Sequence, residues 1–354
     1  MTILGAWPML FKILGKGEFR SLVEIILEFN EIIAPKKIGN KADGEPIHQF
    51  LPINAFEEMD LDYRTTEFSA KTYFLPYREN LCKFRFGDDD WDQEIAYRIQ
   101  PRAIIGLRAY DINALVKLDK VFIRGQFPSP YYISRRENTF VVGLDHVPLE
   151  DEFSQSMGAD IVTHGFDLFL TDLDDRYFVA IASDRGFNLL NRVETQEVTD
   201  DDTQDYKDAR QRILDGFKTH INVHNLPNLL DLEFTSEVWK KWGAKCLSCG
   251  SCAMVCPTCY CYGVREEVSM DFTEATRVKQ LYSCNLLDFA EVAGGHNFRP
   301  DQETRLKYRY YHQHRGFVED YDEPKCVGCN RCGRVCLAGI NPAAVIKDLY
   351  EENF

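Results

Sequence analysis

Six cysteines stand within sixteen residues in the stretch "CLSCGSCAMVCPTCYC", and this density constrains the fold more than any other feature of the chain. The first four have the spacing C-x2-C-x2-C-x3-C and are followed at once by Pro257, which is the cluster-binding run of bacterial ferredoxins. They are Cys246, Cys249, Cys252 and Cys256. The stretch therefore predicts a segment that wraps around an iron–sulfur cluster, with two cysteines, Cys259 and Cys261, left over.

A second run repeats this spacing farther along the chain, at Cys326, Cys329, Cys332 and Cys336. In a run of this type the first three cysteines hold one cluster, and the fourth ligates the other cluster. The duplication thus predicts two [4Fe–4S] clusters that exchange their fourth ligands. We expect cluster one on Cys246, Cys249, Cys252 and Cys336, and cluster two on Cys326, Cys329, Cys332 and Cys256. Small residues inside the loops, such as Gly250 and Gly328, allow backbone N–H groups to point at the sulfurs.

Three other metal-binding patterns are weaker. A structural zinc site typically pairs two C-x2-C knuckles rather than two longer runs. The cysteines at 252, 256 and 259 also spell C-x3-C-x2-C, a radical-SAM pattern, but a second run supplies the fourth thiolate and only a short segment follows. His220 and His224 have the i,i+4 spacing of a metal site on a helix, without a Glu beside the first His. We therefore favour the ferredoxin interpretation.

Cysteine placement, net charge and hydropathy limit the cellular location of the protein and the classes of partner that it can bind. Eleven of the twelve cysteines lie between Cys246 and Cys336, so they are read as ligands that are kept reduced, not as a disulfide framework. A formal net charge of -15 argues against nucleic acid or an anionic membrane surface as a partner. The apolar start is interrupted by Lys12 and is too short to span a membrane. The sequence thus predicts a cytoplasmic protein without membrane insertion, with a docking helix at its N-terminus.

We predict an α+β fold in which residues 1–195 form an α/β scaffold or docking domain. Residues 18–33 have apolar side chains at helical spacing and precede Pro35, so a helix is expected there. "RAIIGLRAYD" indicates a buried strand running to Asp111, the expected N-cap of the helix "INALVKLDKVF". "NTFVVGLD", "FDLFLTDL" and "RYFVAIAS" are predicted strands, the last two joined by a turn. No dinucleotide or phosphate-loop motif accompanies them.

The second half is predicted to contain an acidic linker and helix at 196–235, and then a mainly helical, ferredoxin-like two-cluster domain at 236–354. Sixty-nine residues separate the two runs, and "FTEATRVKQLYSCNLLDFAEV" within them is expected to be helical. The basic, aromatic stretch 305–315 is either a docking surface for an acidic partner or part of the core. Lys325, Arg331 and Arg334 flank the second run, so cluster two is expected to have the higher reduction potential.

The motifs together resemble one known family. "CPTCYCYGV", "YSC", "AGGHNFRP", "RYYHQH" and "CVGCNRCGRVC" are joined by "GLRAYDINALVKLDKVF", "SPYYISRREN" and "GFDLFLTDL". In this order, along nearly the whole chain, they resemble the iron–sulfur β subunit of cytosolic, sulfhydrogenase-type [NiFe] hydrogenases. The A subunit of anaerobic sulfite reductase belongs to the same family. The resemblance implies a hetero-oligomer with a flavin-containing, NAD(P)H- or ferredoxin-linked subunit and a catalytic oxidoreductase subunit.

One departure from the family is informative. Where relatives typically have four cysteines in the first domain, this chain has Tyr110, His146, Glu152 and Ser154. If those cysteines hold a further cluster in relatives, this chain has lost it, because the four replacements are poor ligands for iron–sulfur chemistry. Extra cysteines after Pro257 and near Cys284 do agree with the family. Whether Cys259, Cys261 and Cys284 are ligands stays open, and buried structural thiols are the preferred interpretation.

The favoured function is a non-catalytic electron-transfer subunit that relays single electrons through two [4Fe–4S] clusters within a larger oxidoreductase. A second hypothesis is an enzyme whose first domain binds a substrate or flavin at an unrecognised site. A third is a structural adaptor whose clusters only hold the fold. The sequence does not name the partner complex or the direction of electron flow.

Overall fold

A computed structural model describes the chain except for residues 1–8, 29–30, 88–89, 96–99 and 353–354. Its main sheet has seven strands in the order β1-β9-β8-β7-β6-β2-β3. The strands are β1 (Leu10–Gly15), β2 (Glu31–Asn40), β3 (Pro46–Ile53), β6 (Arg102–Leu107), β7 (Thr139–Leu144), β8 (Leu168–Asp172) and β9 (Arg176–Ile181). The inner strands β2, β6, β7 and β8 run parallel, and antiparallel pairs close both edges. This agrees with an α/β first half.

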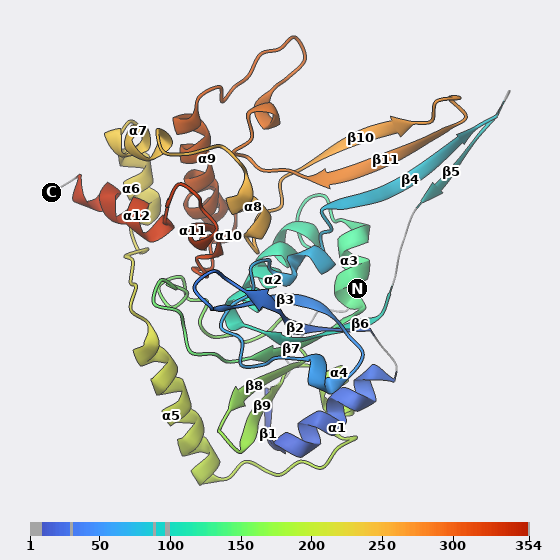
Figure 1. Cartoon of the computed structure of the whole chain (residues 1–354), viewed down its shortest axis with the longest axis vertical. Helices are drawn as coiled ribbons and strands as arrows, with labels where there is room; N and C mark the ends of the chain where they lie inside the picture. Colours follow the sequence, from blue (N-terminus) through green and yellow to red (C-terminus); the bar gives the residue numbers. More distant parts are fainter. Residues whose placement is uncertain (1–8, 29–30, 88–89, 96–99, 353–354) are drawn as a thin grey trace.

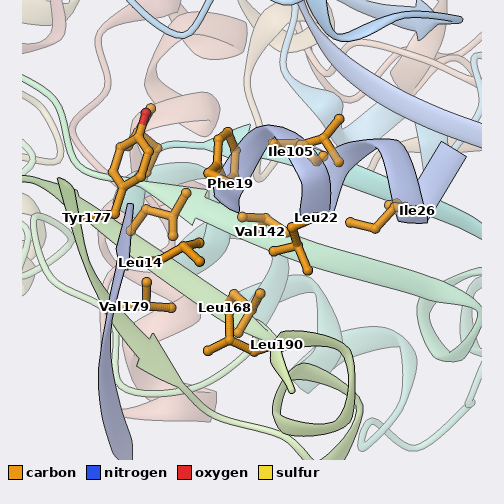
Figure 2. Packing of buried hydrophobic residues seen from close by; sticks show 14 of the residues in the cluster. Leu14, Phe19, Leu22, Ile26, Ile105, Val142, Leu168, Tyr177, Val179 and Leu190 are labelled. Carbon is orange, nitrogen blue, oxygen red and sulfur yellow. The ribbon is translucent and has the colours of Figure 1, made fainter. Parts of the chain in front are cut away.

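Helices cover both faces of this sheet (Figure 1). The helices of this half are α1 (Lys16–Leu27), α2 (Ala109–Phe122), α3 (Pro130–Glu137) and α4 (Asp184–Leu190), with the 3-10 turns η1 (Phe56–Glu58) and η2 (Ala70–Tyr73). Figure 2 shows one core layer, in which Phe19, Leu22 and Ile26 of α1 pack on Val142, Leu168 and Val179 of the strands. A second cluster joins α2 and α3 to the opposite face. Burying apolar surface on both faces is what a parallel sheet requires.

Two boundaries of the first half differ from the sequence prediction. Helix α1 ends at Leu27, and Ile32, Ile33 and Pro35 belong to strand β2 instead of the expected helix over 18–33. Pro35 is tolerated because the parallel pairing of β2 with β6 ends at Ile33, so no ladder bond to β6 is lost. The predicted N-terminal docking helix falls largely on residues outside the described part, and the residues directly after them form strand β1.

The expected N-cap at Asp111 is also wrong. The N-cap of α2 is Arg108, and Asp111 lies in the first turn of the helix. Its carboxylate is used by a tertiary partner, as described below. The other predicted strands of this half are present as β6, β7, β8 and β9, and Asp174, with φ 69°, lies in the turn between the last two.

A second sheet combines distant parts of the chain in the order β10-β11-β4-β5. Its strands are β4 (Arg78–Phe86), β5 (Trp91–Ile95), β10 (Tyr262–Val268) and β11 (Glu274–Leu281), and Figure 1 shows it projecting from the body. The expected helix over "FTEATRVKQLYSCNLLDFAEV" is wrong, because β11 and the turn η3 (Leu287–Ala290) occupy it. Strand β4 pairs with β11 through an antiparallel ladder, a long-range partner that local periodicity does not reveal.

The rest of the second half is a group of helices around the cysteine runs. They are α5 (Asp200–Gly216), α6 (Leu226–Leu232), α7 (Glu237–Gly243), α8 (Ser251–Val255), α9 (Gln302–His314), α10 (Gly316–Tyr321), α11 (Arg331–Arg334) and α12 (Pro342–Glu351). A core of α6, α7, α9 and α12 side chains packs around Trp239. The fold is thus α+β, although the strands β10 and β11 keep the cysteine domain from being mainly helical. Within the described residues, no helix is long and apolar enough to cross a membrane.

Candidate metal centres

The two cysteine runs fold into the same loop. Ser248 and Gly328, two residues after the first cysteine of each run, have φ values of 52° and 68°. Gly250 and Asn330, one residue after the second cysteine, have φ values of 79° and 51°. Each loop then enters a short helix, α8 or α11. Left-handed residues at matching positions turn the backbone sharply, so the internal repeat in the sequence is a repeat in conformation.

Backbone N–H groups of these loops point at cysteine sulfurs. Ser248 N donates to Cys246 Sγ and Gly328 N donates to Cys326 Sγ, both at 3.4 Å. Asn285 Nδ2 donates to Cys252 Sγ at 3.3 Å. Hydrogen bonds to thiolate sulfur stabilise negative charge and tune an iron–sulfur centre. Cysteine sulfurs are soft metal ligands, and the loops also supply backbone N–H groups that donate to these sulfurs. This combination fits an iron–sulfur cluster.

The cysteine side chains line two neighbouring pockets. Pocket one is lined by Cys246, Cys249, Cys252, Cys332 and Cys336. Pocket two is lined by Cys256, Cys326, Cys329 and Cys332. The fourth cysteine of each run therefore faces the pocket of the other run, and Cys332 borders both. This grouping is compatible with the exchange of fourth ligands, which stays a prediction.

The zinc and helical-histidine alternatives lack a matching geometry. Among the described residues, no three His, Cys, Asp or Glu side chains are gathered closely enough to hold a single metal ion. A cubane cluster is larger than an ion and holds its thiolates farther apart. His220 and His224 are exposed and lie outside any helix, so the i,i+4 face that their spacing indicates does not form.

Gly328 is required by close packing as well as by its backbone conformation. A Cβ on Gly328 would lie 2.5 Å from Phe153 O, whereas Gly339, with nearly the same φ, has open space around it. We expect Gly339→Ala to cost about 1–2 kcal/mol from the left-handed backbone alone. Gly328→Ala is expected to cost roughly 1–3 kcal/mol more because of overpacking. Anaerobic urea unfolding of both variants measures the difference, and equal losses would contradict the packing argument.

The second run is held against the first domain by one buried and one partly exposed ion pair. Arg331 Nη1 and Nη2 donate to the two carboxylate oxygens of Asp111 at 2.7 and 2.9 Å, and its Nε donates to Thr66 O at 2.9 Å. Arg334 Nη1 pairs with Asp151 at 2.6 Å. Two of the three cations that flank this run are therefore opposed by carboxylates. They add less positive charge to cluster two than the sequence indicates, which weakens the basis for a higher potential there.

The four residues at the family's missing cysteine positions do lie together. His146 Nε2 is 3.0 Å from Glu152 Oε2, and Ser154 Oγ donates to Glu152 Oε1 at 2.6 Å. The rings of Tyr110 and His146 meet edge to face with centroids 5.2 Å apart. Burial by itself would raise the pKa of Glu152, but the bonds from His146 and Ser154 outweigh burial and lower that pKa. The position is filled by a buried hydrogen-bonded network that packs beside the second cysteine loop.

The three remaining cysteines of the second half are close to cations. Cys259 Sγ accepts hydrogen bonds from Arg309 Nη1 at 3.4 Å and from Gln313 Nε2 at 3.3 Å. A hydrogen bond with Cys284 lowers the pKa of Cys261 to about 4, and His312 and Lys325 act in the same direction. Burial and the bond to Cys261 raise the pKa of Cys284. These thiols lie among positive side chains. The interpretation of these cysteines as buried structural thiols did not predict such neighbours.

The basic stretch 305–315 is largely part of the core, which supports the second of the two alternatives. Helix α9 turns Arg305, Arg309, Gln313 and His314 into the protein, where all four are buried. Arg309 lines both pockets. Sequence analysis did not identify Arg309, Gln313 or the distant Lys71 as neighbours of the cysteines. Only the three-dimensional arrangement reveals these contacts. The positive, aromatic segment between the two cysteine runs could have indicated Arg309 and Gln313, but not Lys71.

Two comparisons show which known proteins the chain resembles in sequence. Residues 245–340 match the family model of the 4Fe-4S dicluster domain. The chain is 34% identical over 332 residues to sulfhydrogenase 2 subunit beta of Pyrococcus furiosus, covering 91% of this chain and 95% of that protein. No solved structure matched the chain.

Proposed function

Because the chain belongs to the family of the sulfhydrogenase β subunit, we propose that it relays single electrons through two [4Fe–4S] clusters within a larger oxidoreductase. The observation that carries the proposal is the pair of conformationally matched cysteine loops facing adjacent pockets with Cys332 between them. When bound, such clusters accept and release one electron each. The chain's own part is to hold them close together, donate hydrogen bonds to their sulfurs and keep water from the inner pocket.

The same family membership supports a set of partners. We propose a hetero-oligomer in which this subunit connects a flavin-containing, NAD(P)H- or ferredoxin-linked subunit with a catalytic oxidoreductase subunit. We also propose a cytoplasmic location, where cysteine ligands are kept reduced. Cys249 is exposed at pocket one, whereas Cys326 and Cys329 of pocket two face the first domain. Exchange with a partner is therefore expected on the side of pocket one.

The N-terminal half supports a second candidate function. A cavity of about 680 Å³ lies at the carboxyl ends of β6, β7 and β8, lined among others by Arg108, Asp145 and Thr171. Ligands of open α/β sheets bind at this edge. This location favours a substrate or flavin site over a purely structural first domain. Heat release of small molecules from the purified chain, followed by absorbance and mass spectrometry, tests for such a ligand.

Metal analysis and redox titration test the electron-transfer proposal directly. We expect about eight iron atoms and a similar number of sulfide ions per chain after anaerobic purification, because each of two clusters contributes four. Both clusters are expected to be reduced and reoxidised reversibly. About twelve iron atoms would indicate a third cluster, with the pocket of Tyr110 and His146 as its first candidate. Clusters that cannot be cycled would support the adaptor hypothesis instead.

A further inference from the structure

Arg309 lies between the two cysteine pockets and borders both of them. Its Nη2 donates to Cys252 O at 3.4 Å, and its Nη1 donates to Cys259 Sγ at 3.4 Å. The side chain is 7% exposed. In the part of the chain that the structure describes, no carboxylate is within ion-pair distance of this guanidinium. Arg309 thus brings a full positive charge into the interior next to cysteines of both runs.

Lys71 and Lys325 bring two more buried cations to the same place, 2% and 1% exposed. Lys71 Nζ donates to Cys256 O at 2.7 Å and to Cys259 O at 3.0 Å, although it comes from the first domain. Lys325 Nζ lies 3.8 Å from the centre of the Tyr260 ring and 3.5 Å from His312 Nε2. Neither ammonium group has a carboxylate partner among the described residues.

A buried cation without an anionic partner is costly, and burial lowers the pKa of Lys71 and of Lys325, so keeping these charges in the interior requires compensation. The anionic groups available to them are cysteine thiolates and whatever those thiolates bind. A positive charge held in a low-dielectric interior interacts strongly over such distances. Since reduction adds one negative charge to a cluster, a fixed buried cation stabilises the reduced form more than the oxidised form. The reduction potential therefore rises.

We propose that Arg309 and Lys71 set the reduction potentials of the two clusters, Arg309 acting on both and Lys71 mainly on cluster two. The inference rests on the proposed function, because it assumes that both pockets hold clusters. It also assigns a role to Cys259, which anchors both cations: its sulfur accepts from Arg309 and its carbonyl oxygen accepts from Lys71. The Cys259 side chain is thus a positioning group for Arg309, whereas its backbone makes the contact with Lys71.

Arg331 and Arg334 make a useful contrast. Both flank the second run, but Asp111 and Asp151 oppose their charges. Of the three unpaired cations, only Lys325 stands next to the second run, whereas Lys71 comes from η2 and Arg309 from α9. Proximity in sequence therefore identifies Lys325 but misses Lys71 and Arg309, and it includes two arginines whose charges are already opposed.

The test is an EPR-monitored redox titration of the full chain with its clusters in place. Arg309→Gln is expected to lower both potentials, each by at least a tenfold change in the reduction equilibrium, which is 59 mV for one electron. Arg309→Lys keeps the charge and is expected to shift both by less. Lys71→Gln is expected to lower the potential of cluster two more than that of cluster one. Cys259→Ala removes the sulfur that accepts from Arg309 but keeps the carbonyl oxygen that accepts from Lys71, so it is expected to reproduce only part of the Arg309→Gln effect.

Lys307→Gln is the matched control, because it removes one positive charge from the same helix at a position that donates to Phe234 O and lines neither pocket. Its potentials are expected to equal those of the unmodified chain. Shifts in Arg309→Gln and Lys71→Gln no larger than in this control, with iron content intact, would overturn the inference. If Arg309→Gln does not retain its clusters, Lys71→Gln decides the question by the same criterion. Irreversible titration of the unmodified chain would instead refute the relay function.

Discussion

Cys256→Ala is expected to remove the cluster of the other run and leave the cluster of its own run in place. Cys256 lines pocket two with Cys326 and Cys329, while the rest of its run lines pocket one. A cluster that loses one of four thiolates is expected to be lost or to be labile. The variant should therefore contain about four iron atoms per chain instead of about eight, measured by anaerobic iron and sulfide analysis.

The reciprocal variant and a matched cysteine make this experiment decisive. Cys336→Ala is expected to lose cluster one by the same reasoning, again with about four iron atoms remaining. EPR spectra of the two variants are expected to show complementary signals whose sum resembles the unmodified chain. Cys259→Ala, three residues after Cys256, is the control and is expected to keep both clusters. Loss of cluster one in Cys256→Ala would show that each run supplies all four of its own ligands.

The second large effect is expected at the ion pair between the second run and α2. Arg331→Met leaves Asp111 charged, buried and without its partner, which costs about 3–5 kcal/mol in comparable sites. Asp111 is 3% exposed and Arg331 is 1% exposed, so water does not replace the lost contact. The variant should unfold at a clearly lower urea concentration than the unmodified chain. Circular dichroism under anaerobic conditions measures this unfolding.

Two further variants separate loss of a partner from loss of packing. Arg334→Met removes the half-exposed pair with Asp151 and is expected to cost about 0–1 kcal/mol. The double variant Asp111→Leu with Arg331→Met removes both buried charges and should recover much of the loss, because an apolar pair avoids the desolvation cost. If Arg331→Met and Arg334→Met unfold at the same urea concentration, the buried pair does not hold the two halves together as argued.

The N-terminal network gives the missing-cysteine observation a structural meaning. Tyr110, His146, Glu152 and Ser154 are adjacent in space, so a site formed by the corresponding residues of relatives is physically coherent. In this chain the position is occupied by side chains that satisfy one another, apart from the hydroxyl of Tyr110. Phe153 N also donates to Gly328 O at 2.9 Å, which ties this network to the second cysteine loop.

Much of this protein could be predicted from local sequence. The spacing of the cysteine runs reflects the geometry of a single loop around a cluster, and the loops have matching left-handed residues at equivalent positions. Apolar strands such as "RAIIGL" and "TFVVGL" were identified because burial on both faces leaves an unbroken hydrophobic run. These features depend on interactions between residues that are close in sequence, so a short stretch of sequence is enough to predict them.

The errors arose where distant partners override local preference. Residues 274–281 became a strand because they pair on one side with β10, in a hairpin, and on the other side with β4, nearly two hundred residues earlier. Asp111 was expected to cap its own helix but binds Arg331 from the cysteine domain. The arginines of α9 were considered for the surface, yet α9 packs between the pockets and the outer helices and turns them inward.

The sequence by itself determined the division of the cysteines into two runs and the α/β character of the first half, and it predicts which cysteines are ligands, because each depends on spacing and periodicity along the chain. Only the tertiary structure decided which charges lie beside which sulfurs. A cation acts on a buried thiolate according to distance and to whether a carboxylate already opposes it. Local sequence shows neither quantity. The arginines next to the second cysteine run are paired with carboxylates, whereas the unpaired cations at the pockets are Lys325 and two residues from distant segments, Lys71 and Arg309.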